Sequence, residues 1–443
     1  MRMSRNLHGV LIGAGSAIFG PPTLLDLFLN VFQGRGILSL VDINSQSLSL
    51  MEGAAKKLNQ LFKGEVEVRC STNRNEMLAN ADFVVISAEE DRINRWKLDW
   101  DIPIRFGIHH TLGENRGPAG LSHTLRTAPL VMDICRDIES LSPDATVIIM
   151  TNPEDRLAYA VSKYTRLRVI GYCDGLWDFK DRYVGKLLET PGEDIHIHAA
   201  GINHAVWIKD IRHRKTGEDL YPQMVKKAEE TGWEPFGYHL YKTYGLWPHE
   251  NDEHYGEYFH YASEFIDIKG YDFDWHMGLD REWKNRIKRF IDGSYDADKF
   301  MEETRDFMWM VFGDAPPSNI IRGLHLGIPT YLPNANIPNR GKLPGLPEDM
   351  VVEVPAVATP SGVFGIRFDK LTDPINAFLF REGVIQKLSA EAAIEGSRDK
   401  ALCALLMDPQ VRSAEIAESL LRSFLEAHKD FIPKAVFSTL IKP

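Results

Sequence analysis

Short apolar or β-branched runs alternate with longer amphipathic stretches over the first 170 residues of the chain. The apolar runs cover residues 8–12, 36–41, 65–69, 81–88, 145–150 and 167–171. Strand–helix alternation at this spacing is typical of a parallel sheet with helices on both faces. The pattern therefore predicts an α/β domain with a doubly wound sheet of the Rossmann type, for which we expect residues 1–192.

The pattern changes after residue 195, where strands and helices mix in an aromatic-rich and then proline-rich region. We expect residues 193–443 to form an α+β domain. Its last seventy residues have helical periodicity with Gly396 and Pro409 as breaks, which predicts a helical layer that packs back on the molecule.

Composition excludes several classes of protein. The 443 residues are 44% hydrophobic and 26% charged, with a net charge of −11, so a polyanion such as nucleic acid is not an expected partner. The apolar runs are strand-length, and we expect no membrane span. Four unevenly spaced cysteines favour a reducing cytoplasm over a disulfide scaffold.

A glycine turn follows the first predicted strand. Gly13, Gly15 and Ser16 lie between that strand and a predicted helix over residues 17–30, with Ile18 where a third glycine is usual. Such a turn lets a pyrophosphate approach a helix N-terminus. Asp42, after the second strand, would bind an adenosine ribose and favour NAD over NADP, although an aspartate that caps the turn before Asn44 is an alternative.

Polar residues follow three later strands. Asn152 and Cys173 come after the fifth and sixth strands, and Asn203 and His204 end another apolar run. Carboxyl ends of parallel strands are where open sheets bind ligands, and a thiolate with an imidazole can bind a divalent metal. Taken singly, these residues are more typical of a turn asparagine, a small buried cysteine and a hydrogen-bonded core histidine.

Five motifs in order resemble glycoside hydrolase family 4, the NAD- and manganese-dependent glycosidases, and the resemblance extends from residue 9 to about residue 409. The motifs are Gly13-Ala14-Gly15-Ser16, Thr151-Asn152-Pro153, Gly171-Tyr172-Cys173-Asp174-Gly175, Gly201-Ile202-Asn203-His204, and Asn336-Ile337-Pro338-Asn339 with Val351-Val352-Glu353-Val354-Pro355. The resemblance implies an O-glycosyl hydrolase with a second domain like that of lactate and malate dehydrogenases. It also implies a homodimer or homotetramer.

The same resemblance implies cleavage by elimination. The cofactor oxidises C3 of the sugar, a base removes the C2 proton, the aglycone leaves C1, water adds and the hydride returns. Cys173 and His204 would hold Mn²⁺ or another divalent metal. Asn152 would bind a sugar hydroxyl near the nicotinamide, and Asn203 would contact the substrate. Asp174 would protonate the leaving oxygen, because its position matches that of the acid in the family, and a cap of the helix beginning near residue 176 is the alternative.

Two segments indicate the sugar. Residues 111–127, which include Glu114 as a substrate-binding candidate, and residues 245–258 are similar to the α-galactosidase and uronidase subgroup. Gly175-Leu176 replaces the Met-Pro pair of the phosphate-specific subgroup. A non-phosphorylated α-galactoside or α-galacturonide is therefore favoured. An α-glucosidase, a 6-phospho-α-glucosidase and a net NAD-dependent dehydrogenase are the alternatives.

Asn251 occupies the position at which family members carry the tyrosine or aspartate that removes the C2 proton, and an asparagine does not serve well as a base. Asp252, His254 and Tyr255 are the neighbouring candidates, and a polar loop rim is the alternative for each. Arg126 and Arg340, like Arg116, would bind the carboxylate of a uronide, or else form structural ion pairs.

Overall fold

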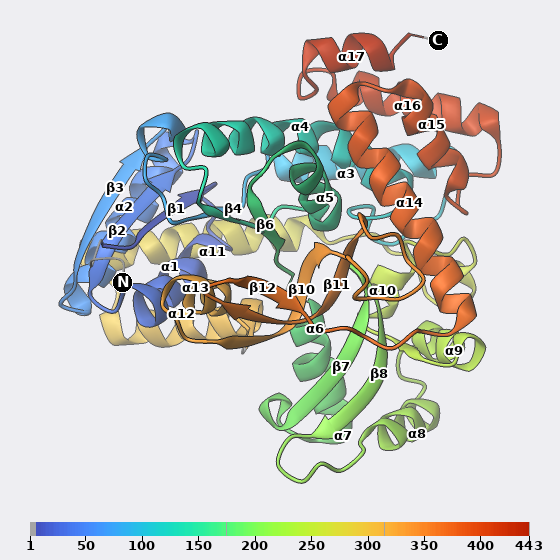
Figure 1. Cartoon of the computed structure of the whole chain (residues 1–443), viewed down its shortest axis with the longest axis horizontal. Helices are drawn as coiled ribbons and strands as arrows, with labels where there is room; N and C mark the ends of the chain where they lie inside the picture. The colour runs from blue at the N-terminus through green and yellow to red at the C-terminus, as the bar shows by residue number, and fades with distance from the viewer. Residues whose placement is uncertain (1–5, 174, 314, 443) are drawn as a thin grey trace.

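A computed structural model describes residues 6–173, 175–313 and 315–442 of the chain. One mixed sheet runs through this part of the molecule in the order β3-β2-β1-β4-β5-β6-β10-β11-β7-β8-β9, with β12 paired to β11 (Figure 1). The sheet continues across the two predicted domains, so side chains from both halves meet where β6 adjoins β10.

The first six strands are parallel and have the strand order of a dinucleotide-binding fold. The strands are β1 (His8–Ile12), β2 (Arg35–Val41), β3 (Glu65–Ser71), β4 (Phe83–Ile86), β5 (Thr146–Ile149) and β6 (Arg168–Gly171). The predicted doubly wound α/β fold is confirmed, and each observed strand overlaps an apolar run of the sequence.

Helices cover both faces of this parallel part. Val10 and Ile12 of β1 point into one core and Leu11 into the other, because successive strand residues face opposite sides. The helices of this half are α1 (Gly20–Leu27), α2 (Ser45–Leu61), α3 (Arg92–Ile104), α4 (Gly117–Leu141), α5 (Glu154–Tyr164), α6 (Gly175–Asp178) and α7 (Lys186–Leu188). The first two pack with one core, and α3, α4 and α5 with the other.

Helix α1 begins three residues later than the predicted start at residue 17. A Cβ atom at Gly20 would lie 2.6 Å from Met51 Cε and 3.0 Å from the Ala14 carbonyl oxygen. Gly20 therefore provides the close helix packing for which the sequence pattern predicted a glycine at position 18.

The second half extends the sheet with antiparallel strands. Its strands are β7 (Ile195–Ile202), β8 (Ala205–His213), β9 (Trp247–Pro248), β10 (Thr330–Pro338), β11 (Val351–Thr359) and β12 (Gly362–Gly365). Its helices are α8 (Tyr221–Thr231), α9 (Pro235–Tyr244), α10 (Asp252–Tyr255), α11 (Phe273–Asp292), α12 (Ala297–Phe312) and α13 (Ser318–His325).

The last four helices form the predicted helical layer, drawn in orange to red in Figure 1. They are α14 (Asp373–Glu395), α15 (Arg398–Met407), α16 (Ala414–His428) and α17 (Lys434–Leu440). Helix α14 packs against α4 and α5, and Gly396 ends it with a φ of +67°. The layer therefore covers the first half of the chain, although it belongs to the end of the sequence.

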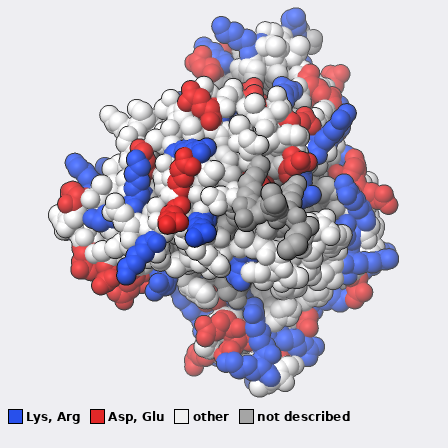
Figure 2. All heavy atoms as spheres, turned by 60° about the vertical axis from the view of Figure 1, so that its left-hand side comes forward, with Lys and Arg blue, Asp and Glu red and all other residues white. Residues whose placement is uncertain are grey.

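Three further properties bear on the sequence-based expectations: the surface charge, the hydropathy of the helices and the state of the cysteines. On the face shown in Figure 2, positive and negative side chains are intermixed. Among the described residues, no helix combines the length and the apolar character that crossing a membrane requires. All four cysteines lie in the described part and are free thiols.

Candidate active site

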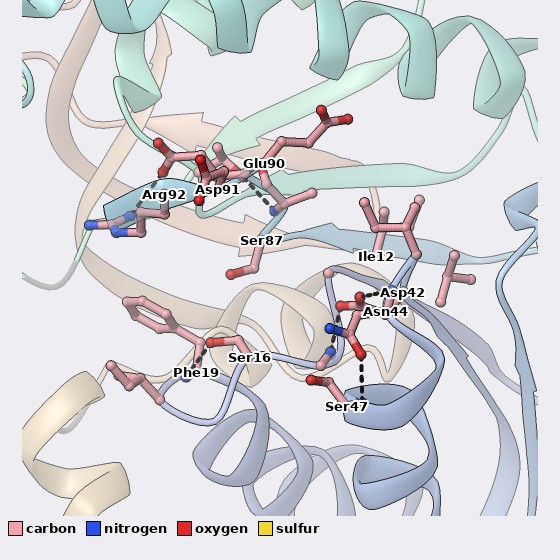
Figure 3. A pocket seen from close by; sticks show the side chains of 18 of the residues that line it. Ile12, Ser16, Phe19, Asp42, Asn44, Ser47, Ser87, Glu90, Asp91 and Arg92 are labelled. Atoms are coloured by element: carbon pink, nitrogen blue, oxygen red, sulfur yellow. Dashed lines mark hydrogen bonds and ion pairs between the residues drawn. The ribbon is translucent and has the colours of Figure 1, made fainter. Parts of the chain in front are cut away.

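A cleft of about 950 Å³ lies at the carboxyl ends of the strands β1, β2 and β4 (Figure 3). The glycine turn and Asp42 form part of its wall, and residues after β4 form another part. Helix α11 contributes His276, Arg281 and Lys284. Sequence reasoning missed these three residues, because α11 is more than 200 residues from the glycine turn and only the fold brings it to the cleft.

The two turn glycines are required by close backbone approach. Gly13 has a φ of +83°, and a Cβ atom there would lie 2.1 Å from the Ser87 carbonyl oxygen. A Cβ atom at Gly15 would lie 2.7 Å from Asp42 Oδ2. Any larger side chain would therefore distort the turn that borders the cleft.

Asp42 holds the turn with both carboxylate oxygens. Oδ2 accepts a hydrogen bond from the Gly15 amide at 2.8 Å, and Oδ1 accepts one from the Asn44 amide at 2.8 Å. The turn-capping role is thus present, and the same side chain lines the cleft, so the two interpretations are compatible. Ser16 lies beside it, where its Oγ accepts from the Phe19 amide at 3.1 Å.

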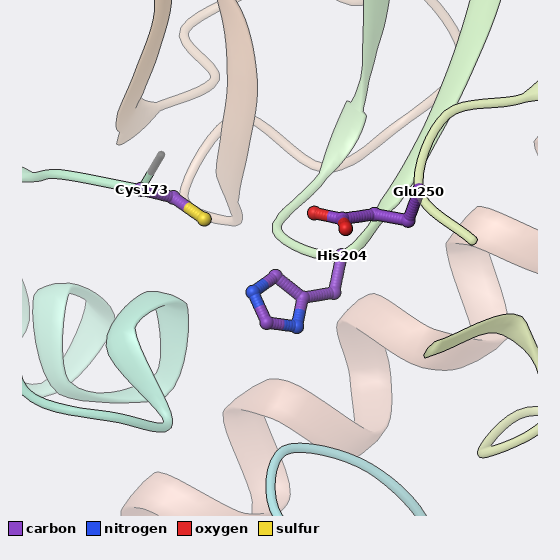
Figure 4. Close-up of side chains that lie close together, drawn as sticks. All are labelled: Cys173, His204 and Glu250. Atoms are coloured by element: carbon purple, nitrogen blue, oxygen red, sulfur yellow. The ribbon is translucent and has the colours of Figure 1, made fainter. Parts of the chain in front are cut away.

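Three potential metal ligands converge at the junction of the two halves. One ligand atom each of Cys173, His204 and Glu250 lies within 4.8 Å of the others (Figure 4). Cys173 follows β6, His204 is in the turn between β7 and β8, and Glu250 follows β9. Sulfur, nitrogen and oxygen donors at this separation can surround one divalent transition metal ion.

The backbone of this cluster is held in an uncommon conformation. His204 has a φ of +60° and Glu250 a φ of +85°, both in the left-handed region. Left-handed non-glycine residues cluster at functional sites, where surrounding contacts hold them. A Cβ atom at Gly175 would lie 1.7 Å from Glu250 Oε1, so the glycine after residue 174 makes room for the Glu250 carboxylate.

Burial keeps His204 in the form that binds metals. Loss of solvent around the buried imidazole, and then the nearby His254 and Arg116, lower its pKa well below the ordinary value. The ring is therefore neutral near pH 7. Its Nδ1 lies 3.2 Å from the Asn115 amide nitrogen, and its ring points into the space shared with Cys173 (Figure 4).

His254 is the candidate base whose ring borders the cluster. Its ring centroid lies 4.9 Å from that of His204 in an edge-to-face arrangement. Its Nδ1 lies 2.8 Å from Asn251 Oδ1, while Asn251 Nδ2 donates to the Tyr183 hydroxyl at 2.9 Å. These bonds assign the proton of the neutral ring to Nδ1 and leave the Nε2 lone pair able to accept a proton. Burial lowers the His254 pKa to about 4.

The other two base candidates are engaged in structural bonds. The Asp252 carboxylate accepts from the Phe236 and Gly237 amides at 2.9 and 2.7 Å, which caps the first turn of α9. The Tyr255 hydroxyl is buried and donates to the Val206 carbonyl at 2.6 Å. These contacts favour His254 over Asp252 and Tyr255.

The predicted asparagines follow two different strands of the sheet, β7 and β5. Asn203, next to His204, is buried, and its amide donates to carboxylate oxygens of Glu154 and Glu353 at 3.3 and 3.2 Å. Asn152 is partly buried directly after β5. Asp174, the predicted acid, lies outside the described residues.

The predicted carboxylate-binding arginines have other positions. Arg126 is buried in ion pairs with Glu89 and Asp99, each at 2.9 Å. Arg340 is exposed beyond the end of β10. Strand β10 is antiparallel to β6 and its Asn336 pairs with Gly171 at the carboxyl end of β6. Arg340 therefore lies toward the amino end of β6, away from Cys173. Arg116, the third arginine, pairs with Asp155 at 2.7 Å.

Glu114 lies nearer to the cluster. Its carboxylate pairs with Arg92 at 2.5 Å and accepts from the Asn115 amide, which also contacts His204. Glu250 itself was not among the sequence-predicted ligands. The segment 245–258 signalled its region, but a glutamate can be recognised as a ligand only when the fold brings it to Cys173.

Known protein families account for both halves of the chain. The model described as "Family 4 glycosyl hydrolase" matches residues 9–189, and "Family 4 glycosyl hydrolase C-terminal domain" matches residues 199–411. The chain belongs to glycosyl hydrolase family 4. It is therefore an O-glycosyl hydrolase, as the ordered motifs predicted.

Individual family 4 proteins match over nearly the full length. An alpha-glucosidase from Erwinia rhapontici is 31% identical, covering 90% of this chain and 93% of its own. An alpha-galactosidase from Bacillus subtilis (strain 168) is 26% identical, covering 96% and 98%. The solved 6-phospho-alpha-glucosidase from gut microorganisms, in complex with NAD and Mn²⁺, has a TM-score of 0.81 at 20% identity and covers 97% and 99%. The structural match confirms the family fold.

Proposed function

We propose that this family 4 protein is an NAD- and Mn²⁺-dependent α-glycosidase that cleaves neutral, non-phosphorylated α-hexosides. The observation that carries the proposal is the convergence of Cys173, His204 and Glu250 within 4.8 Å. A thiolate, a neutral imidazole and a carboxylate form a donor set that suits a divalent transition metal.

The cleft at the carboxyl ends of β1, β2 and β4 supports NAD as the cofactor. Gly13 and Gly15 let the turn pack closely against Ser87 and Asp42. A tight glycine turn between a strand and a helix is what allows a pyrophosphate to approach the backbone of a dinucleotide-binding fold. The Asp42 carboxylate in the cleft wall would repel a 2′-phosphate and so disfavours NADP. A structural neighbour solved with NAD and Mn²⁺ adds support.

When bound, NAD⁺ would supply oxidation and later reduction at C3, and the metal would supply Lewis acidity at the C2 and C3 oxygens. His254 Nε2 then accepts the C2 proton, with Asn251 holding the ring through Nδ1. Asp174 donates a proton to the leaving glycosidic oxygen. Asn152, Asn203 and Glu114 are the proposed substrate-contacting residues, and water adds across C1 and C2 to complete hydrolysis.

Two observations support a neutral sugar. Gly175 leaves room for Glu250, whereas the Met-Pro pair typical of the phosphate-specific subgroup would put a side chain into that space. The arginines Arg116 and Arg126 are paired with internal carboxylates rather than free for a substrate carboxylate. A galacturonide is therefore less well supported than an α-galactoside or an α-glucoside, the activities for which the two relatives are named.

The test is hydrolysis of 4-nitrophenyl α-galactoside, α-glucoside, α-galacturonide and α-glucoside 6-phosphate, each with and without NAD⁺ and Mn²⁺, in D₂O. We expect cleavage of a neutral α-hexoside that requires both additions, yields deuterium at C2 and accumulates no NADH. Cys173→Ser should abolish it. NADH formed in proportion to product would indicate a net dehydrogenase instead, and cleavage confined to the phosphorylated glucoside would contradict the proposed substrate.

The proposal also includes a homodimer or homotetramer in a reducing cytoplasm. Phe364 on β12 and the neighbouring Ile366 have exposed apolar side chains, and the four cysteines are free thiols. Light scattering of the purified protein gives its mass in solution, and a monomer would contradict this part of the proposal.

A further inference from the structure

Two sequence motifs have no role so far. They are residues 336–339, at the end of β10 and in the turn after it, and residues 351–355 of β11. Strands β10 and β11 lie between β6, which leads to Cys173, and β7, which leads to His204. Asn336 of β10 is opposite both Gly171 of β6 and Glu353 of β11. Glu353 is in turn opposite Gly201 of β7. The motifs therefore cross the sheet at the level from which both metal-ligand segments leave it.

The Glu353 carboxylate contacts both ligand segments through asparagine amides. Its Oε1 accepts from Asn334 Nδ2 at 2.9 Å, and the same amide group donates to the Cys173 carbonyl oxygen at 3.0 Å. Its Oε2 accepts from Asn203 Nδ2 at 3.2 Å, and Asn203 is the residue before His204. One buried carboxylate thus connects the backbone of Cys173 to the residue that carries His204.

A second pair of contacts stiffens this connection. Asn336 Nδ2 donates to Glu353 Oε2 and to Glu154 Oε2, each at 3.3 Å, and Asn203 Nδ2 also donates to Glu154 Oε2 at 3.3 Å. Glu154, Asn203, Asn336 and Glu353 are each 1% exposed. Burying a carboxylate is unfavourable unless its oxygens are hydrogen-bonded, so this arrangement tolerates little displacement of its members.

We propose that Glu353 is a positioning residue that sets the separation of Cys173 and His204 and thereby the affinity of the metal site. This inference rests on the proposed function, because it concerns the same metal. The two ligands follow different strands, and Glu353 adds side-chain contacts to both ligand segments beyond the backbone pairing of β6, β10, β11 and β7. Groups that orient metal ligands in this way commonly contribute 10- to 100-fold to metal affinity.

The test is Glu353→Gln, which keeps the size of the side chain but replaces one acceptor oxygen by a donor. A glutamine cannot accept from Asn334 on one side and from Asn203 and Asn336 on the other, so one connection must break. Mn²⁺ affinity is measured by equilibrium dialysis, and Co²⁺ reports the thiolate through its sulfur-to-metal charge-transfer absorption. We expect Mn²⁺ binding to weaken about 10- to 100-fold and the Co²⁺ band to shift or lose intensity.

The matched control is Asp26→Asn, another buried carboxylate changed to its amide. Asp26 on α1 is bound by Ser318 and Asn30, away from the metal cluster. The Asp26→Asn variant should have a lower unfolding temperature than the wild type but the same Mn²⁺ affinity and the same Co²⁺ absorption band. Equal metal binding by Glu353→Gln and the wild type would overturn the proposal.

Asn334→Ala is the second variant, in case Glu353→Gln does not fold. Asn334 is only partly buried, and its loss removes the connection to Cys173 alone. It should also weaken Mn²⁺ binding, and unchanged binding would contradict the role of Glu353. Absence of Mn²⁺ binding and of a thiolate band in the wild type would instead refute the proposed function, and the inference with it.

Discussion

At the residue scale, Gly13 and Gly107 have similar backbone φ angles but different surroundings. Their φ angles are +83° and +74°, but a Cβ atom at Gly107 would meet nothing within 4 Å, whereas one at Gly13 would overlap the Ser87 carbonyl. Gly107→Ala should destabilise the protein by about 1 kcal/mol for the backbone alone. Gly13→Ala should cost a further ~1–3 kcal/mol through overpacking and weaken NAD⁺ binding. Urea unfolding and NAD⁺ titration measure both effects, and equal losses would contradict the close approach.

His254 carries the second prediction. His254→Gln removes the proposed base, so kcat should fall by about 10²- to 10⁴-fold and deuterium exchange at C2 should be lost. Tyr255→Phe is the control, because it removes only the hydroxyl bond to Val206 and should retain exchange. If His254→Gln still exchanged deuterium at C2, His254 would be excluded as the base and Asp252 would be the next candidate.

Asp26 predicts a pH dependence of stability. Burial raises its pKa to about 6, above the value of 3.8 expected in the unfolded chain. The folded state therefore holds the proton more tightly, and this contribution to stability is lost as the pH rises from about 4 to about 6. The free energy of unfolding of the wild type relative to Asp26→Asn should fall by about 2 kcal/mol between pH 4 and pH 6 and by about 3 kcal/mol over the whole titration. Urea unfolding measures this difference, and a difference between wild type and variant that does not change with pH would contradict the raised pKa of Asp26.

At the element scale, Arg126 joins three helices. It extends from α4 to Asp99 of α3, which also contacts His428 of α16 at 2.8 Å, and it reaches Glu89 on the other side. Arg126→Met leaves buried carboxylates without their partner and should destabilise the protein by about 3–5 kcal/mol. The ratio of kcat/KM for a galactoside to that for a galacturonide should not change. A selective loss of the galacturonide would instead support a substrate-binding arginine.

The elements themselves show how far local pattern extends. All six parallel strands could be predicted. The buried strands are short apolar runs, and the edge strand β3 alternates charged and β-branched residues at its start. The start of α1 could not be predicted from the sequence, because the need for a glycine at position 20 depends on the close packing of Met51 of α2. Arg126 and Arg340 could not be separated from substrate-binding arginines, because ion pairs and strand direction are properties of the assembled sheet.

At the scale of the whole molecule, the cleft is lined by parts of both halves, namely the glycine turn from the first half and α11 from the second. Ligand binding to this folded arrangement should stabilise the entire chain, by about 2.7 kcal/mol at an NAD⁺ concentration of 100 Kd. NAD⁺ should raise the unfolding temperature and NADP⁺ should raise it much less, because Asp42 repels the 2′-phosphate. In Asp42→Ala, the increases in unfolding temperature caused by NAD⁺ and by NADP⁺ should become more similar. Equal increases with the two cofactors in the wild type would contradict a preference for NAD.

The sequence by itself determined the parallel strands, the glycine turn, the family and the polar residues at the strand ends, because each depends on neighbours within a few positions or on ordered motifs. Only the tertiary structure brought Glu250 to Cys173, connected Glu353 to both ligand segments and engaged Arg126 internally. These relations join residues that are from tens to more than a hundred positions apart. Their distances are decided by strand order and packing, which local periodicity does not encode.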